Sequence, residues 1–270
     1  MNSYFFCKNS HSWLRQPGFF HRSQLGCLDI FLLATILLCG LGLRIFCWSQ
    51  SGAVSRDASW YLLIAERWFT QGSAQAAFSG ESWTAPLLPW LIQLGMYLGG
   101  SAEITGLLLN LFSGTLLSLI VWAILYRAGC RRELCLAGAL LIALHPSAVE
   151  LSIEIQRDSL YLFWIGLTIL GLENAFLRPG NWLAWCLAGA CCGFAATARL
   201  EGLEAVVVVP IATFITACAD RKRYQQFLWG GIAFLLVVIA VLLLLLVCMG
   251  AMESFYGLCQ QKIANRFHIM

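Results

Sequence analysis

Seven long apolar runs constrain this sequence more than any other feature, at 28–48, 104–126, 133–150, 159–177, 182–198, 203–219 and 227–250. A helix that crosses a bilayer needs about 20 apolar residues. Only 11% of the residues are charged, against about 25% in soluble domains, so lipid surrounds most of the chain. The runs lack the alternation of barrel strands, and backbone in lipid must otherwise pair within helices. The predicted fold is an all-α polytopic membrane protein with about seven transmembrane helices.

The segment between the first two runs, 49–103, is predicted to be a long outer loop that carries interfacial helices. Its apolar stretch 86–99 is too short for a span and fits an interfacial or re-entrant helix. Residues 1–27 lack the features of a cleavable signal peptide and are interpreted as a cytoplasmic tail before a retained first span. Residues 28–250 then form the transmembrane module, and 251–270 form an outer tail.

The basic residues predict the orientation, because short cytoplasmic loops are rich in Lys and Arg. The two tightest basic clusters, YRAGCRR at 126–132 and DRKR at 220–223, fall on the same side as the N-terminal tail. That side is predicted to be cytoplasmic. Most acidic residues and the longest loop fall on the opposite face. Functional residues concentrate in loops held by a rigid scaffold, so we expect the site on this outer face.

The first candidate is Asp57, in the stretch SRDASWYLLIAERW at 55–68. An apolar stripe with helical spacing follows it and is typical of a helix in the membrane interface. The stripe consists of Tyr61, Ile64, Ala65 and Trp68. Two interpretations stay open at this point. Asp57 is a functional carboxylate, or else Asp57 or Ser55 caps the helix, where the helix dipole favours negative charge.

A second group of charges lies in HPSAVELSIEIQRDSLY at 145–161. Spacings of three and four predict that they share one helical face; they are Glu150, Glu154, Arg157 and Asp158. Ionisable residues at a membrane boundary are costly and by default suggest function. The alternative is that the four form ion pairs that only cap the next span.

A third pair of charges, Arg199 and Glu201, lies in ATARLEGLEA at 195–204, between two apolar runs with almost no polar linker. The alternative interpretation is an arginine that extends its charge to the membrane surface while its stem stays apolar. In the predicted orientation all three groups emerge on the outer face, although the orientation was derived from basic residues at the other face.

Taken in order, these features resemble the GT-C superfamily of membrane glycosyltransferases. Within it they resemble the family 39 branch of protein O-mannosyltransferases and aminoarabinose-transferase-like enzymes. The resemblance spans roughly residues 28–220. It rests on Asp57 four residues before Tyr61, TAPLLPWL at 84–91, NLFSGTLL at 110–117, ALHP at 143–146, RDSLY at 157–161 and AGACCGFAATARLEG at 188–202.

The resemblance implies transfer of a sugar from a polyprenyl-phosphate donor to an acceptor outside the cytoplasm. It implies Asp57 as general base, with Glu154 or Asp158 as a second acid, and a divalent metal such as Mg or Mn held by Asp57 and Asp158. A hydroxyl acceptor needs a base within hydrogen-bond reach, and a departing phosphate needs a cation. The implied substrate- and phosphate-binding residues are Tyr61, Arg157, Arg199, Glu201, Lys262 and Arg266. The partners are the lipid-linked donor and membrane lipids, with no nucleic acid.

The alternative class is a non-catalytic membrane protein with the same scaffold, either a partner subunit or a lipid-carrier transporter. Members of the family usually have more spans and often a C-terminal domain, whereas this sequence ends shortly after its seventh run. A transporter would place polar residues near the membrane midplane, in broken helices. The apolar runs carry few ionisable residues, which favours an enzyme with its site at one face.

Overall fold

The computed structural model describes residues 26–51, 55–78, 85–253, 255–257 and 259–260, and within them every regular element is helical. The helices are α1 (Cys27–Gln50), α2 (Arg56–Gln71), α3 (Ala74–Ala77), α4 (Leu87–Tyr97), α5 (Ala102–Arg127), α6 (Arg132–Leu144), α7 (Pro146–Ile153), α8 (Arg157–Leu177), α9 (Trp182–Ala198), the 3₁₀ turn η1 (Leu200–Leu203), α10 (Glu204–Ala219) and α11 (Tyr224–Met249). The predicted fold class, an all-α polytopic membrane protein, is confirmed.

Within the described residues, five helical segments are long and apolar enough to cross a membrane: α1, α5, α8, η1 with α10, and α11. The pair α6 and α7 passes the same test as a sixth, although a bend of 52° separates the two helices. The remaining predicted span, 182–198, corresponds to α9, an apolar helix of 17 residues. At 1.5 Å per residue it is about 26 Å long, slightly less than the hydrocarbon core.

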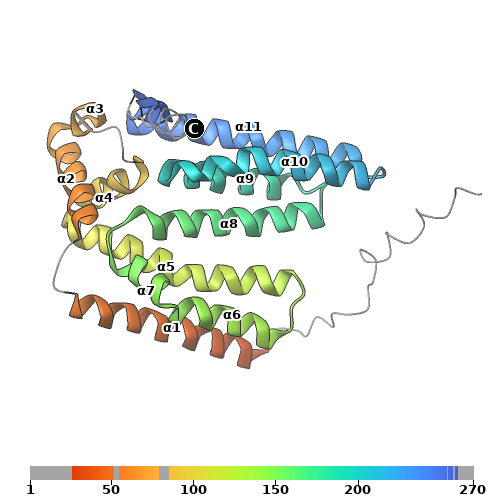
Figure 1. Ribbon diagram of the computed structural model, residues 1–270, viewed down its shortest axis with the longest axis horizontal. Helices are drawn as coiled ribbons and strands as arrows, with labels where there is room; N and C mark the ends of the chain where they lie inside the picture. Colours follow the sequence, from red (N-terminus) through yellow and green to blue (C-terminus); the bar gives the residue numbers. More distant parts are fainter. Residues whose placement is uncertain (1–25, 52–54, 79–84, 254, 258, 261–270) are drawn as a thin grey trace, which may run out of the picture.

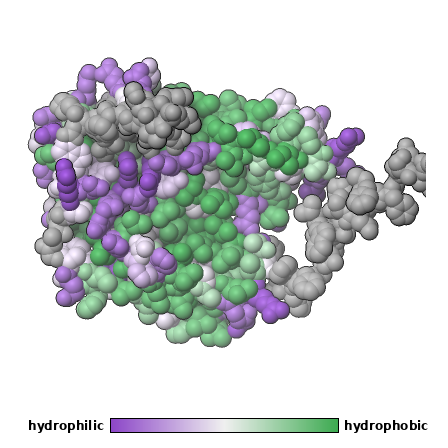
Figure 2. Space-filling view, in the orientation of Figure 1, coloured by the Kyte–Doolittle hydropathy of each residue, from purple (hydrophilic) through white to green (hydrophobic). Residues whose placement is uncertain are grey.

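The long helices lie side by side and share two ends (Figure 1). One end carries α2, α3 and α4, the ends of α9 and α11, and the starts of α5 and α8. The loops 128–131, 178–181 and 220–223 lie at the opposite end, so both basic clusters lie away from α2. Hydrophobic residues cover the middle of the bundle, and hydrophilic residues gather toward its ends (Figure 2). Which end faces the cytoplasm remains a prediction.

A break divides the predicted run 133–150. His145 has extended backbone, with φ −62° and ψ 123°, and separates the end of α6 from Pro146 at the start of α7. Proline has no N–H to continue a helix, and it disfavours helical backbone in the residue before it. The dipeptide His145-Pro146 therefore explains the break.

The acidic second loop also differs from its prediction. α7 ends at Ile153, and Glu154 is extended, with φ −93° and ψ 143°. α8 begins only at Arg157. The prediction that Glu150, Glu154, Arg157 and Asp158 share one helical face is therefore wrong, because they belong to two helices and the extended link between them.

Arg44, in the middle of the fold, is fully buried and is not among the predicted site residues. Its guanidinium donates hydrogen bonds to the carbonyls of Ala143 (2.9 Å) and Ile142 (3.4 Å) in the last turn of α6. It also donates to the carbonyls of Gly40 (3.0 Å) and Gly114 (3.4 Å). The last carbonyls of a helix have no partner within it and carry partial negative charge. Arg44 therefore stabilises the end of α6 that the break creates.

Small residues allow α9 to pack closely between α8 and α11. A Cβ on Gly189 would lie 2.7 Å from the carbonyl oxygen of Phe234 in α11, and one on Gly171 of α8 would lie 3.0 Å from Cβ of Ala188. Small residues permit such close backbone approach between membrane helices. This packing fixes the position of Arg199, which follows α9 directly.

The predicted stripe on α2 is present, but it packs against protein. Tyr61, Ile64, Ala65 and Trp68 are all at most 7% exposed. They join one hydrophobic cluster with residues of α4, α8, α9 and α11. α4, the short helix predicted at 86–99, packs against both α2 and α5. The first residues of α2 are therefore held over the ends of the long helices.

Candidate functional site

The start of α2 shows whether Asp57 caps the helix or leaves its carboxylate available. Ser55 is the N-cap, because its hydroxyl oxygen accepts a hydrogen bond from the backbone N–H of Ala58 at 3.2 Å. Asp57 is the second residue of the helix and is exposed. Within the described residues its carboxylate has no hydrogen bond or ion pair. The helix dipole favours its charge, and the carboxylate remains free for a ligand.

Tyr61 lies one turn after Asp57 and is 7% exposed. Burial raises the pKa of its hydroxyl, because removal from water disfavours the phenolate. The positive charges of Arg157 and Arg199 act in the opposite direction, and the negative charge of Asp57 raises the pKa further. Tyr61 also packs in one hydrophobic cluster with Leu160 of α8 and with Ala198, the residue before Arg199. Residues from α2, α8 and the end of α9 are therefore brought together.

Arg199 is the centre of an ion-pair cluster. Its NH1 pairs with the carboxylate of Asp158 at the start of α8, and its Nε lies 3.0 Å from Oε2 of Glu201. The guanidinium carbon also lies 5.9 Å from the centroid of the Tyr161 ring, which suits a cation–π contact. The side chains of Arg199, Asp158 and Glu201 are 35%, 23% and 29% exposed, so a ligand at the end of the bundle reaches them.

Arg157, the first residue of α8, has fewer side-chain partners than Arg199. It is half-buried, and within the described residues it forms no hydrogen bond or ion pair. Its charge nevertheless acts on Tyr61. The site therefore offers one arginine whose charge is already balanced by two carboxylates and one arginine that is available to an anion.

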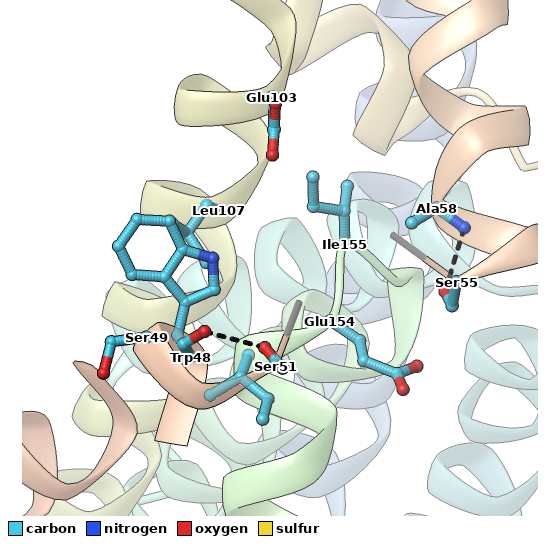
Figure 3. A pocket seen from close by; sticks show the side chains of 10 residues that line it. Trp48, Ser49, Ser51, Ser55, Ala58, Glu103, Leu107, Glu154 and Ile155 are labelled. Atoms are coloured by element: carbon cyan, nitrogen blue, oxygen red, sulfur yellow. Dashed lines mark hydrogen bonds between the residues drawn. The ribbon is translucent and has the colours of Figure 1, made fainter. Parts of the chain in front are cut away.

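Glu154 lies apart from this cluster. Its carboxylate accepts a hydrogen bond from the side chain of Gln156, and its backbone carbonyl accepts one from the buried Asn110 of α5. Its side chain lines a pocket of about 440 Å³ that Ser55 and Glu103 also line (Figure 3). Of the two competing acids, Asp158 thus belongs with Arg199, whereas Glu154 belongs to this pocket.

The metal prediction for Asp57 and Asp158 is not supported by a ready set of ligands. The Asp158 carboxylate is occupied by Arg199. In the part of the chain that the structure describes, no three His, Cys, Asp or Glu side chains come together as a metal site. Metal binding stays a prediction, and no chemical step below depends on it. Lys262 and Arg266 lie outside the described residues.

The pocket residues Glu103 and Trp48 are not among the predicted site residues. Glu103 follows the N-cap of α5, and Trp48 lies in the last turns of α1. Neither belongs to a motif of charged residues in the sequence. Only the packing of α1, α2, α5 and α7 brings them to one pocket, so no local signal was available to find them.

The protein is a polytopic membrane protein, helical in every regular element of the described residues, with charged side chains that converge at one end of the bundle. Residues 84–245 match the family described as dolichyl-phosphate-mannose-protein mannosyltransferase. The match covers more than half of the 270 residues, so the chain belongs to this family. No curated protein and no solved structure matches the chain.

Family membership confirms the broader part of the resemblance. This is a family of membrane glycosyltransferases that use polyprenyl-phosphate-linked sugars as donors. The family 39 branch and its aminoarabinose-transferase-like relatives stay a prediction. The matched segment contains Arg157, Asp158, Arg199 and Glu201, whereas Asp57 precedes it. The role of Asp57 therefore depends on its position in the site.

Proposed function

We propose that the chain transfers a sugar from a polyprenyl-phosphate donor to a hydroxyl acceptor at the end of the bundle that carries α2. The observation that supports this most is geometric: Tyr61 of α2 packs in one cluster with Leu160 of α8 and Ala198 at the end of α9, beside the ion pair of Arg199 with Asp158. A carboxylate and an arginine that have no partner among the described residues, Asp57 and Arg157, begin two of these helices. Acid–base chemistry and stabilisation of a departing phosphate need these two groups.

In the proposed reaction the acceptor oxygen attacks the anomeric carbon of the sugar. The bond between that carbon and the phosphate oxygen breaks, and polyprenyl phosphate leaves with the bonding electrons. Asp57 takes the acceptor proton, because its exposed carboxylate has no other partner among the described residues. Arg157 binds the phosphate. Arg199, which Asp158 and Glu201 hold in place, contributes positive charge near that phosphate. The end that carries this site is proposed to face away from the cytoplasm.

The test is sugar transfer from radiolabelled polyprenyl-phosphate sugars by the protein in lipid vesicles. Asp57→Asn keeps the shape and removes the base, so we expect turnover to fall by about 100-fold or more. Glu66→Gln, on the exposed face of the same helix, is the matched control and should transfer at the parent rate. Parent-like transfer by Asp57→Asn would show that Asp57 is not the base. A parent protein that transfers no sugar from any such donor would favour the non-catalytic partner or transporter.

A further inference from the structure

The pocket beside the charged cluster has a chemistry of its own. Its volume of about 440 Å³ is in the range of small-ligand sites, roughly 300–1,000 Å³. The end of α1, the start of α2, the start of α5 and the link after α7 form its walls (Figure 3). The polar and aromatic lining residues are Trp48, Ser49, Ser51, Ser55, Glu103 and Glu154.

The hydroxyl groups of this pocket mostly offer acceptors to a ligand. Ser49 donates its proton to the carbonyl of Phe46 at 2.7 Å, and Ser51 donates to the carbonyl of Trp48 at 2.8 Å. A serine hydroxyl has one proton, so both donors are used within α1 and its C-cap. The oxygens of Ser49 and Ser55 each accept one hydrogen bond, from Nε2 of Gln50 at 3.4 Å and from the N–H of Ala58 at 3.2 Å. Since a hydroxyl oxygen has two lone pairs, each keeps acceptor capacity. A ligand that donates hydrogen bonds therefore fits these walls better than one that accepts them.

The charged groups of the pocket are both acidic. Glu103 is exposed and has no hydrogen bond or ion pair among the described residues. Glu154 uses Oε2 for Gln156, which leaves Oε1. Among the described residues that line the pocket, none is Lys or Arg. Two uncompensated carboxylates repel a phosphate or a carboxylate ligand and attract a cation. The indole of Trp48, 40% exposed, adds a ring face that favours a cation.

We propose that this pocket binds a protonated primary amine carried by the acceptor substrate. An ammonium group has three donors and no acceptor, which complements two carboxylates and the serine oxygens. The assignment to the acceptor rests on the proposed function, because the anionic donor is expected beside Arg157. The binding of the amine does not depend on it. The pocket shares Ser55 and Ala58 with the start of α2, so an acceptor held there lies next to the helix that carries Asp57.

The test compares two ligands that differ at one position, glucosamine and glucose, on the full chain in detergent micelles. Ligand-observed NMR gives both affinities without any turnover. We expect glucosamine to bind at least about tenfold more tightly, the usual size of a hydrogen bond to a charged group. Equal binding would show that the pocket recognises hydroxyl groups, and it would overturn the proposal. Ethanolamine distinguishes the sources: binding like glucosamine indicates a simple amine head group, and weaker binding indicates an amino sugar.

Two variants assign the binding to this pocket. Glu103→Gln should lower the affinity for glucosamine about tenfold and leave the affinity for glucose unchanged. Glu66→Gln removes an exposed carboxylate that does not line the pocket, and it should bind both ligands like the parent. Unchanged glucosamine binding by Glu103→Gln would contradict the proposal. Asp57→Asn should still bind glucosamine more tightly than glucose.

The two proposals can fail separately. If Asp57→Asn loses sugar transfer but the parent binds glucosamine and glucose equally, the amine site is wrong and the proposed function stands.

Discussion

Arg44 and Arg199 use the same side chain in opposite ways. Arg44 is fully buried and donates to backbone carbonyls of three helices. Arg199 is 35% exposed and donates to the carboxylates of Asp158 and Glu201. Backbone carbonyls of packed helices cannot turn toward another partner. The carboxylates of Asp158 and Glu201 are partly exposed side chains at the end of the bundle, so the guanidinium that they bind is accessible to an anionic ligand.

This difference separates a cation that holds the fold from one that serves a site. Burying an arginine is costly unless its donors find acceptors. The end of α6 supplies carbonyls for both terminal nitrogens of Arg44, whereas its Nε has no acceptor among the described residues. Arg199 gains little net stability from partly exposed ion pairs. We therefore expect Arg199 to matter for sugar transfer more than for stability, and the two residues should respond to mutation in different assays.

The largest effect should follow Arg44→Met. The substitution leaves the carbonyls of Ile142 and Ala143, at the end of α6, without the donor that Arg44 supplies. Each such group costs about 1–3 kcal/mol, so the loss should reach several kcal/mol. The yield of monodisperse protein and the unfolding free energy in mixed micelles measure it. Arg178→Met, in an exposed loop, is the control and should fold normally. Parent-like stability of Arg44→Met would show that Arg44 does not hold the break.

Arg199→Gln should have the opposite effect: it should keep stability and lose sugar transfer. The variant should fold with little change in unfolding free energy, because the lost ion pairs are partly exposed. Sugar transfer should fall about 100-fold, the usual effect of removing a charge that stabilises a transition state. Arg199→Lys keeps the charge and should recover part of the rate. Arg223→Gln, at the other end of the bundle, is the control. A stability loss as large as that of Arg44→Met would break the comparison.

The helices and the convergence of charges were predictable for a physical reason. Lipid forces long apolar runs into helices, and short loops then alternate between the two ends. Asp57, Asp158 and Arg199 consequently share one end. The break at His145-Pro146 was also readable from the sequence, because the effect of proline is local. The extended link at 154–156 between α7 and α8 carries no such signal, and it is the reason that the predicted helical face with Glu154 is wrong.

Tertiary packing determines the contacts that could not be predicted from the sequence. Arg44 lies in an apolar run and finds its partners about 70 and 99 positions away, at Gly114 and Ala143. Glu103 and Trp48 meet only because α1 and α5 pack together. Spacing along one chain segment carries no information about such contacts.

Gly114→Ala should lower the unfolding free energy by less than Arg44→Met. A Cβ at this position would lie 1.9 Å from Oγ and 2.7 Å from Cβ of Ser152 in α7. Since Ser152 is fully buried, the backbone must shift, which costs about 1–3 kcal/mol. Gly42→Ala is the matched control, because its Cβ would meet nothing within 4 Å. There we expect no loss of unfolding free energy, and a gain of up to about 1 kcal/mol. Equal stability of the two variants would show that α5 and α7 are less tightly packed than described.

The smallest effect should come from Tyr61→Phe, and only at alkaline pH. Burial raises the pKa of the Tyr61 hydroxyl above its value in the unfolded chain, which is about 10. Between these two pKa values the folded state retains a proton that the unfolded state loses, so unfolding free energy falls as pH rises. Tyr61→Phe should remove this part of the decline, whereas Tyr97→Phe, at an exposed position, serves as the control. Arg157→Gln sharpens the test, because it removes a positive charge that lowers the Tyr61 pKa. The pKa should then rise further and the decline should extend to higher pH, as followed by phenolate absorbance and unfolding at each pH. An unchanged Tyr61 pKa in Arg157→Gln would mean that the two residues are not neighbours. Arg157 would then not be the cation of this site.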